Sequence, residues 1–213
     1  MGVPRLHVWG RGVSLDLFDP RRRDEELRTH WTRSRPGDLL VGYVGRIAAE
    51  KQVHRLEVLA DMPGTRLVVV GDGPGRGAMR DRLPGARFTG MLRGTDLARA
   101  FASLDVFVHT GEAETFCQTV QEAQASGVPV VAPAVGGPLD LVDHERTGLP
   151  YRPGDPEDLR RRVATLAGDP ALRASMSAAA RAAVRGRGWD RVVDELIDVH
   201  YAALVGRPLP AVA

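Results

Sequence analysis

Cysteine, asparagine and lysine are scarce or absent in this chain of 213 residues, and long apolar runs are missing as well. Because Cys117 is the only cysteine, an internal disulfide and a cysteine metal cluster are excluded, and a reducing compartment is indicated. No apolar stretch approaches the roughly 18 residues that a membrane span needs, and the N-terminus lacks a signal-peptide pattern. We therefore expect no transmembrane segment.

The charged residues are numerous but balanced. Lys and Arg total 29 and Asp and Glu total 27, which gives a formal net charge of +2, so neither a surface of one sign nor a nucleic-acid partner is predicted. Lys51 is the only lysine, because the other basic residues are all arginine. A lysine is a compact point charge that reaches a phosphate oxygen, whereas arginine is a planar fork. Lys51 is therefore a candidate phosphate contact. The alternative is that it is a surface lysine on a helix, retained by chance and without a specific role.

Apolar, β-branched runs alternate with amphipathic stretches along most of the chain, which predicts a Rossmann-like α/β fold: a parallel sheet with helices on both faces. The predicted strands cover residues 39–44, 66–70, 87–89, 105–109, 128–132 and 148–151. The predicted helices cover residues 50–61, 76–83, 96–103, 116–126, 155–167, 170–187 and 189–205. We expect residues 1–37 to be an irregular segment, residues 38–187 to form the α/β domain, and residues 188–213 to form a C-terminal helix and a frayed tail.

In such a sheet, ligands bind beyond the carboxyl ends of the strands. The first strand is followed by the sequence G-R-I-A-A-E-K at positions 45–51. Gly45 lets the backbone approach a ligand closely, and Arg46 and Lys51 flank a helix start, where free N–H groups and the helix dipole favour an anion. This arrangement suits a diphosphate, although a surface arginine and an inconsequential Glu50–Lys51 pair explain it equally well.

Two carboxylates follow the strand predicted at 105–109. Glu114 precedes a helix and Glu122 lies about two turns into it. Because helix side chains lean toward the N-terminus, Glu122 can point back at a ligand placed there. Two carboxylates suit the paired hydroxyls of sugar rings, and the N–H groups of Gln118 and Thr119 then face phosphates. A solvated helix glutamate is the alternative for Glu122, but its apolar neighbours favour a specific role.

Two glycine-rich turns also follow strands. The turn at Gly136–Pro138 is either a cover for a nucleotide or sugar or a plain turn. The sequence G-D-G-P-G at 71–75 fails the G-x-G-x-x-G spacing because residue 76 is arginine, so a dinucleotide cofactor is not predicted.

Taken together, these motifs resemble the family-4 glycosyltransferases of GT-B fold. The matching segments are G-R-I-A-A-E-K at 45–51, G-D-G-P at 71–74, F-T-G at 88–90, E-T-F-C-Q-T-V-Q-E at 114–122, A-S-G-V-P-V-V-A at 125–132 and G-G at 136–137. The resemblance runs over nearly the whole chain, to the second, donor-binding half of that fold. The stretch from His109 to Gly137 most resembles bacterial mannosyltransferases that use GDP-mannose.

The resemblance implies a role for each charged residue. Arg46 and Lys51 would hold the diphosphate, Glu114 the hydroxyls of the transferred sugar, and Glu122 the ribose hydroxyls. The amides of Phe116 to Thr119 would stabilise charge on the departing nucleoside diphosphate. Catalysis is thus assigned to Glu114, Arg46 and Lys51.

The segment 87–91 would line the base. The full set expected to bind the nucleotide sugar is Gly45, Arg46, Lys51, Arg87, Thr89, Met91, Glu114, Thr115, Phe116, Cys117, Gln118, Thr119 and Glu122. No metal is expected, because the histidines are scattered in the sequence and the family needs no bound metal. His109 is interpreted as a strand-end histidine with a satisfied hydrogen bond, and a sugar contact is the alternative.

The chain departs from the family at two positions. The family usually has glycine where Cys117 stands, so the cysteine side chain either crowds the sugar or is tolerated. The family also often has glycine after the lysine, where this chain has Gln52. Neither change touches the charged residues.

The sequence thus predicts the nucleotide-sugar-binding domain of a retaining hexosyltransferase, with GDP-mannose as donor and no other cofactor. The acceptor is not identified (a lipid or a glycan fits), and the missing first half would come in cis or in trans, joined through the last helix. Alone, the chain would bind donor and transfer little. The expected location is the cytoplasm, or peripherally the inner membrane face. The alternatives are a non-catalytic nucleotide-sugar-binding module and a sugar-nucleotide 2-epimerase.

Overall fold

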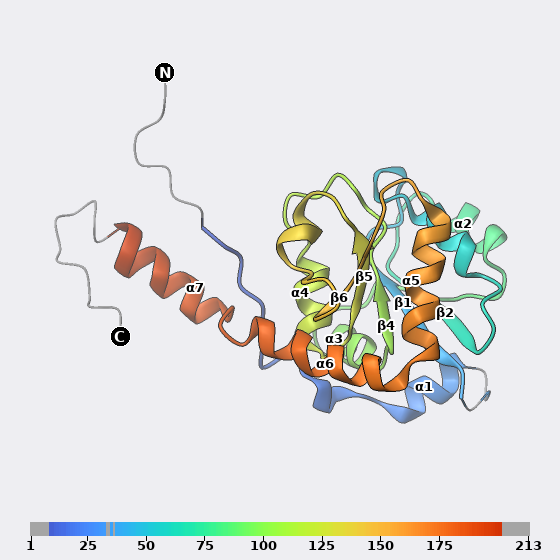
Figure 1. The fold of residues 1–213 in the computed structure, drawn as a ribbon, viewed down its shortest axis with the longest axis horizontal. Coiled ribbons are helices and arrows are strands. Elements are labelled where there is room, and N and C mark those ends of the chain that lie inside the picture. Colours follow the sequence, from blue (N-terminus) through green and yellow to red (C-terminus); the bar gives the residue numbers. More distant parts are fainter. Residues whose placement is uncertain (1–8, 33–34, 36, 202–213) are drawn as a thin grey trace, which may run out of the picture.

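A computed structural model describes residues 9–32, 35 and 37–201 (Figure 1). Its centre is one sheet in which every pair of neighbouring strands runs parallel. Within the described residues the strands are β1 (Leu39–Val44), β2 (Thr65–Val70), β3 (Arg87–Gly90), β4 (Val106–Val108), β5 (Val130–Pro133) and β6 (Gly148–Tyr151). Their spatial order is β3-β2-β1-β4-β5-β6, the order of a doubly wound nucleotide-binding fold. The predicted fold class is confirmed.

The strands are almost continuously apolar because helices cover both faces of the sheet. Along β1, Leu40 and Val44 belong to one hydrophobic core, whereas Val41 and Tyr43 belong to the core on the opposite face. The same alternation in β2 and β4 places a packed layer on each side of the sheet.

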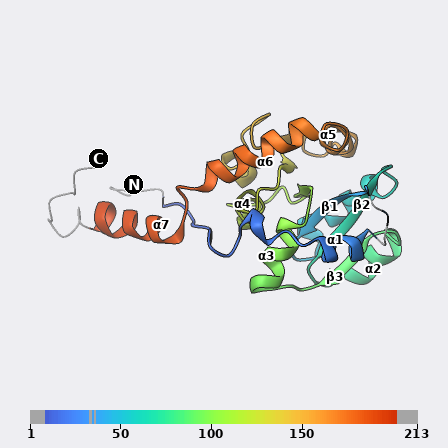
Figure 2. The ribbon, with the colours of Figure 1, turned by 90° about the horizontal axis from the view of Figure 1, so that it is seen from below.

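The α-helices divide between these two layers, as Figures 1 and 2 show. In the described part of the chain they are α1 (Glu25–Trp31), α2 (Arg76–Arg82), α3 (Gly94–Ala102), α4 (Gln118–Ala125), α5 (Pro156–Gly168), α6 (Pro170–Val184) and α7 (Trp189–Glu195). Side chains of α1, α3 and α4 fill one core, and those of α2 and α5 fill the other. Helix α6 packs against both α4 and α5. Short 3-10 helices cover Pro20–Arg22, Ala49–Lys51, Val53–Leu59 and Gly137–Asp140, and a π-helical stretch covers Leu196–Tyr201.

The structure corrects two predictions of local structure. The segment expected to be irregular contains α1, which begins where the Asp24 side chain accepts a hydrogen bond of 2.8 Å from the Leu27 N–H. The α1 helix is held by the burial of Trp31, so tertiary packing stabilises a helix too short to persist alone. The helix expected at 50–61 is instead two 3-10 helices, separated by Gln52 in the left-handed conformation at φ 51°. A left-handed residue ends a right-handed helix.

The C-terminal helix projects away from the α/β body (Figures 1 and 2). It begins at Trp189 as α7 and continues to Tyr201, while the remainder of the predicted helix and the tail lie outside the described residues. The N-terminal segment runs beside it, since the Trp9 indole N–H donates to the Val192 carbonyl at 3.0 Å and Val13 bridges to Gly188. Large apolar side chains are exposed here, namely those of Trp9, Trp189, Val193, Ile197, Val199 and Tyr201.

Candidate functional site

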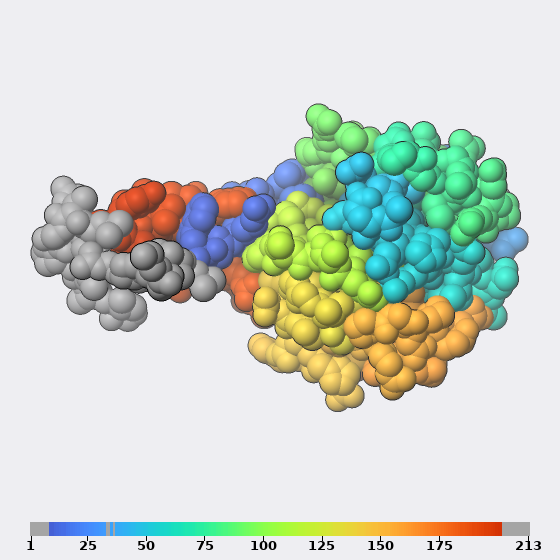
Figure 3. All heavy atoms as spheres, turned by 90° about the horizontal axis from the view of Figure 1, so that it is seen from above, coloured from blue at the N-terminus to red at the C-terminus, as the bar shows by residue number. Residues whose placement is uncertain are grey.

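The site lies where the order of the strands reverses, between β1 and β4. The chain leaves β1 toward β2 on one side and leaves β4 toward β5 on the other, so the loops that follow these two strands diverge and open a crevice at the carboxyl edge of the sheet. Figure 3 looks onto this edge, where the light-blue segment after β1 lies beside the yellow-green segment after β4.

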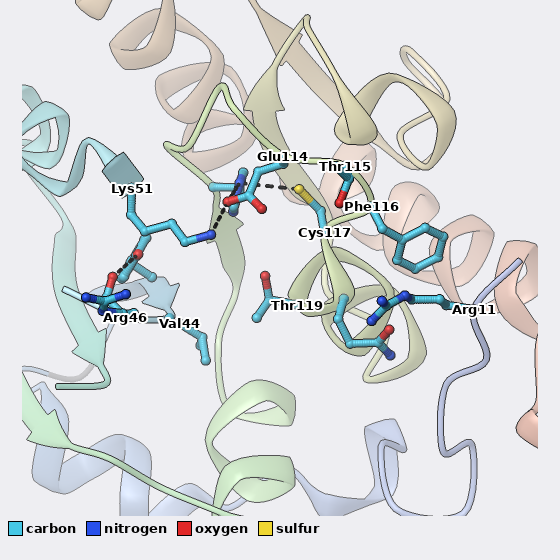
Figure 4. A pocket seen from close by; sticks show the side chains of 13 residues that line it. Arg11, Val44, Arg46, Lys51, Glu114, Thr115, Phe116, Cys117 and Thr119 are labelled. Atoms are coloured by element: carbon cyan, nitrogen blue, oxygen red, sulfur yellow. Dashed lines mark hydrogen bonds and ion pairs between the residues drawn. The ribbon is translucent and has the colours of Figure 1, made fainter. Parts of the chain in front are cut away.

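A cavity of about 330 Å³ occupies this crevice (Figure 4). Nine of the predicted site residues line it, and they are Gly45, Arg46, Lys51, Glu114, Thr115, Phe116, Cys117, Gln118 and Thr119. Four further residues complete the lining, and they are Arg11, Tyr43, Val44 and His109. The structure therefore brings together most of the residues that the sequence singled out, from two loops more than 60 positions apart in the chain.

Lys51 reaches across the cavity from the loop after β1. Its ammonium Nζ donates to Glu114 Oε1 at 2.5 Å, and its backbone carbonyl accepts a hydrogen bond of 2.6 Å from the Thr110 hydroxyl. The lysine side chain is 29% exposed and the glutamate side chain 14%. The backbone of Lys51, the only lysine of the chain, is thus held by Thr110, and its ammonium is paired with Glu114. The side chain also lines the cavity.

The Glu114 carboxylate is ionised over the whole physiological range. The nearby His109, whose Nε2 lies 3.5 Å from Glu114 Oε1, and the ammonium of Lys51 lower the pKa of Glu114 to about 2, although burial acts in the opposite direction. Glu114 is therefore a hydrogen-bond acceptor, not an acid.

The double glycine at 136–137 holds the Glu114 loop in place. The Gly137 N–H donates to the Glu114 carbonyl at 2.8 Å, and Gly136 has a φ of 63°. A Cβ on Gly137 would stand 2.7 Å from the backbone nitrogen of Phe116, which no side chain tolerates. The motif therefore acts through backbone contact with the loop that carries Glu114, a role for which glycine is required.

A second contact fixes the same loop from the other side. The Glu112 carboxylate pairs with Arg55 and accepts a hydrogen bond of 2.9 Å from the Gly154 N–H. The guanidinium of Arg55 contributes most to lowering the pKa of Glu112. The loop between β4 and α4 is thus tied to the 3-10 helix Val53–Leu59 and to the turn after β6, and this pre-organises Glu114.

Helix α4 points its N-terminus at the cavity. Cys117 precedes the helix at a φ of 65° and makes no side-chain cap, so the chain turns sharply between Glu114 and the first helical turn. The first N–H groups of a helix lack intrahelical acceptors, and Gln118 and Thr119, which carry them here, line the cavity. This end of the helix favours an anion.

Cys117 and His109 lie against Glu114 at the closed end of the cavity. Cys117 Sγ is 3.4 Å from His109 Nε2, and both residues are buried. Burial, followed by the negative charge of Glu114, raises the pKa of the Cys117 thiol to about 12, so the thiol is protonated and is a poor nucleophile. One ligand atom from each of His109, Glu114 and Cys117 lies within 4.8 Å of the others. The histidines are scattered along the chain and do not indicate this metal-capable cluster, because the other two ligands are a carboxylate and a thiol.

Arg46 stands at the rim of the cavity. Its side chain is 65% exposed and pairs with Glu50 at 3.3 Å, while its carbonyl accepts a hydrogen bond of 2.9 Å from the Tyr43 hydroxyl. The guanidinium is free to reorient toward a ligand, because an exposed pair of this kind contributes little.

Glu122 does not line the cavity. It is half-buried in the second turn of α4, and its side chain makes no hydrogen bond or ion pair with the described residues. Burial raises the pKa of Glu122 to about 7, so an uncompensated carboxyl group sits behind the helix N-terminus. Its role toward a ligand stays a prediction.

The residues expected to line a base lie apart from the others. Arg87, at the start of β3, donates to His30 Nε2 at 2.8 Å and lines a different cavity. The Thr89 hydroxyl donates to the Gly90 carbonyl, and Met91 is exposed beyond the end of β3. Only Thr89 and Met91 lie at the carboxyl edge of the sheet, and contact with a base stays a prediction for all three.

Arg11 is the charged lining residue that sequence reasoning missed. It lies in the N-terminal segment, 28 residues before the start of β1 and without a motif around it. The Gln118 side-chain amide donates to the Gly12 carbonyl at 2.9 Å, which brings the segment to the N-terminus of α4. In Figure 4, Arg11 stands at the end of the cavity opposite Lys51. No local pattern signals this contact, because it depends on the path of the chain past α4.

The comparison with protein families agrees with this geometry. Residues 28–183 match the model of the glycosyl transferases group 1. Since the match covers most of the chain, including every element of the sheet, the chain belongs to the group 1 glycosyltransferase family.

Individual relatives extend the match beyond these bounds. A GDP-mannose-dependent alpha-mannosyltransferase of Mycolicibacterium smegmatis is 53% identical over 206 residues, which is 96% of this chain and 53% of the relative. The chain spans about half the length of the curated mannosyltransferases it matches.

Solved structures show which half this is. The C-terminal domain of a group 1 glycosyltransferase from Francisella tularensis superposes with a TM-score of 0.68 at 20% identity, covering 81% of this chain and 96% of that domain. An Anabaena protein crystallised with UDP-glucose superposes with a TM-score of 0.79 at 25% identity, covering 90% of this chain and 56% of that protein. The fold is therefore that of the C-terminal half of a GT-B glycosyltransferase. In the part of the chain that the structure describes, no helix is both long enough and apolar enough to cross a membrane.

Proposed function

We propose that this chain is the donor-binding domain of a retaining mannosyltransferase, that its donor is GDP-mannose, and that residues 38–187 bind it. The observation that carries the proposal is the meeting of Lys51 and Glu114 at the strand-order reversal, beside the N-terminus of α4. One cation, one permanently ionised acceptor and a row of free amides in a single cavity match a diphosphate joined to a sugar. The mannosyltransferase relatives support the choice of donor.

In this proposal the Lys51–Glu114 pair opens when donor binds. The Lys51 ammonium turns from the carboxylate to the diphosphate, and Arg46 leaves its exposed pair with Glu50 to join it. Glu114 then accepts hydrogen bonds from hydroxyl groups of the sugar. Both charges stay compensated throughout, because each exchanges one partner for another.

The sugar leaves the diphosphate as the glycosidic bond breaks, and negative charge grows on the departing phosphate oxygen. Once Lys51 and Arg46 have turned to the diphosphate, they and the free amides at the start of α4 stabilise this charge. The donor's own phosphate assists deprotonation of the acceptor. These side chains supply all the positive charge of the scheme, and no metal takes part in it.

The acceptor site belongs to a first half that is supplied in cis or in trans. The exposed apolar side chains of α7 and of the segment beside it form a surface suited to that half. Alone, the chain should bind donor and transfer little. Its single thiol fits a reducing compartment, so we place the protein in the cytoplasm.

Ligand-induced thermal shifts test donor binding. GDP-mannose, UDP-glucose and ADP-glucose are compared at equal concentration, and a ligand at 100 times its dissociation constant stabilises the fold by about 2.7 kcal/mol. For a domain of this size the melting temperature should rise by roughly 5–10 °C. Lys51→Ala should abolish most of the shift, and Arg185→Ala, which removes an exposed cation outside the cavity, should keep it. Equal shifts in the two variants, or no shift with any ligand, would contradict the proposal.

Product analysis then tests the reaction. The chain is incubated with GDP-mannose alone and after addition of the N-terminal half of a mannosyltransferase relative, with a mixed lipid and glycan extract as acceptor. Mannosylated product with retained configuration is expected only when both halves are present. Conversion of the donor without acceptor would indicate an epimerase, and binding without turnover in the assembled pair would indicate a module that only recruits.

A further inference from the structure

We propose that His109, Glu114 and Cys117 form a site for Zn²⁺ at the closed end of the cavity. Imidazole nitrogen, carboxylate oxygen and thiolate sulfur are the three ligand types of zinc in proteins. A thiolate disfavours hard cations such as Mg²⁺ and Ca²⁺, which select oxygen ligands. The resemblance leads us to expect glycine at position 117, so it does not itself supply the thiolate ligand.

The geometry suits a tetrahedral ion. With Zn–S near 2.3 Å and Zn–N and Zn–O near 2.0 Å, neighbouring ligand atoms of a tetrahedral site stand about 3.3–3.6 Å apart. Nε2 of His109 is 3.4 Å from Cys117 Sγ and 3.5 Å from Glu114 Oε1, and all three ligand atoms lie within 4.8 Å of one another. Three protein ligands leave a fourth position for water.

The backbone holds the three ligands independently of a metal. His109 directly follows β4, and its N–H donates to the Val131 carbonyl of β5 at 2.8 Å. The Glu114 carbonyl is held by Gly137, and Cys117 is fixed at the left-handed turn into α4. An ion that binds here meets ligands that are already close. It must displace the proton of the thiol, which passes to solvent, and His109 must bind it as neutral imidazole with its proton on Nδ1.

One group opposes the metal. Lys51 Nζ lies 2.5 Å from the same oxygen, Glu114 Oε1, so its positive charge competes with the ion for the carboxylate. Nδ1 of His109 is buried and makes no hydrogen bond with the described residues, so the imidazole lacks the outer partner that usually strengthens a zinc site. The expected affinity is therefore moderate, and removing the ammonium should raise it.

Zinc at this position would exclude the donor. The ion engages the carboxylate that we assign to the sugar hydroxyls and fills the end of the cavity, so Zn²⁺ and GDP-mannose should compete. The competition rests on the proposed function, whereas binding of the metal does not.

Cobalt spectroscopy of the whole chain tests the site without an activity assay. Co²⁺ titrated into the protein should give a near-ultraviolet thiolate-to-metal charge-transfer band, and Zn²⁺ should abolish it. Cys117→Ser should remove the band, and His109→Gln should weaken Zn²⁺ binding at least about tenfold. The control His54→Gln removes an exposed histidine of the 3-10 helix Val53–Leu59 and should leave the band and the Zn²⁺ affinity unchanged. Absence of the band in the wild-type chain, or Zn²⁺ affinity unchanged in both site variants, would overturn the proposal. Circular dichroism confirms folding, and His109→Gln remains informative should the serine variant not fold.

Lys51→Met separates the two uses of the cavity. It should raise Zn²⁺ affinity severalfold, because the competing ammonium is gone, and lower GDP affinity at least tenfold. A lower Zn²⁺ affinity in this variant would contradict the idea that Lys51 and the metal compete for the same oxygen of Glu114.

Direct competition completes the test. Saturating Zn²⁺ should lower GDP-mannose affinity in the wild-type chain and have no such effect in Cys117→Ser. If cobalt binds but donor affinity is unchanged by Zn²⁺, the metal site stands and its exclusion of donor is wrong. If cobalt binds and no nucleotide sugar binds at all, the proposed function fails instead.

Discussion

Glu122 carries a cost to stability that should grow between about pH 4.5 and pH 7 and stay constant at higher pH, and replacing it with glutamine tests this directly. The carboxyl group is half-buried in the second turn of α4 without a partner among the described residues. Burial raises its pKa from 4.5 to about 7. Because the folded protein binds this proton more tightly than the unfolded chain, the proton stabilises the fold fully below about pH 4.5. That stabilisation is lost as pH rises through about 7.

The size of the effect follows from the shift. A difference between 4.5 and about 7 in pKa, at 1.36 kcal/mol per unit, corresponds to roughly 3 kcal/mol above pH 8 and to less than about 1 kcal/mol at pH 5. Glu122→Gln has nearly the same shape and no charge. It should therefore stabilise the protein by roughly 2–3 kcal/mol more at pH 8 than at pH 5. In a domain of this size the difference amounts to about 5–10 °C in melting temperature.

Urea denaturation of wild type and Glu122→Gln at pH 5, 6, 7 and 8 measures this directly. Glu157→Gln is the control, because Glu157 lies exposed in the first turn of α5. The two unfolding free energies should converge at pH 5 for Glu122→Gln and diverge as the pH rises, while the control stays parallel to wild type. Parallel curves for Glu122→Gln would refute the reasoning, since they would mean that the carboxyl group titrates as if exposed.

Three further predictions follow from the site. If Glu122 accepts hydrogen bonds from ribose, its ionisation on GDP binding near pH 7 should release up to about half a proton per site. Calorimetry in buffers of different ionisation enthalpy measures the release, and Glu122→Gln should lower it by that amount. Gly137→Ala should push its new Cβ against the Phe116 backbone, 2.7 Å away. It should destabilise the fold by about 1–3 kcal/mol and abolish the GDP-induced thermal shift. A loss of stability without a loss of GDP binding would show that the position of the Glu114 loop does not determine binding. At Gln52, with its φ of 51°, glycine should be tolerated or slightly stabilising and valine should cost roughly 1–3 kcal/mol, so equal unfolding free energies for the two variants would argue against a left-handed residue.

Much of the fold was predictable because the strands are recognisable in the sequence as short apolar runs rich in β-branched residues. The β-branched runs of β1, β2 and β5 alternate with helices, and that alternation alone predicts a covered parallel sheet. The prediction was wrong where local pattern and tertiary contact disagree. The α1 helix depends on burying Trp31, and the segment at 50–61 is interrupted by one left-handed residue that the apolar spacing does not reveal.

In the candidate site too, residues in sequence motifs were predicted, whereas residues placed by long-range contacts were missed. Residues in the two motif loops meet in one cavity, because the carboxyl ends of β1 and β4 are adjacent in the sheet. Arg11 was missed because its place depends on a long-range contact of Gln118 with the N-terminal segment. The cluster around Cys117 was missed because its three residue types form no metal motif in sequence and converge only when the left-handed turn folds the loop back onto β4.

The two departures from the family's glycine pattern are linked by this backbone. Gln52 directly follows Lys51 and has a φ of 51°, and Cys117 follows Glu114 by three residues and has a φ of 65°. Both are left-handed positions, where glycine has no steric cost and other residues carry strain of about 1–3 kcal/mol. A glycine at either position would be explained by this conformation, and the turns persist here because the surrounding contacts hold them. The side chains that replace glycine then differ in consequence. Gln52 lies outside the lining of the cavity, whereas Cys117 places its sulfur inside it, 3.4 Å from His109. A position whose family residue is set by backbone geometry has thereby become one at which this chain can add chemistry.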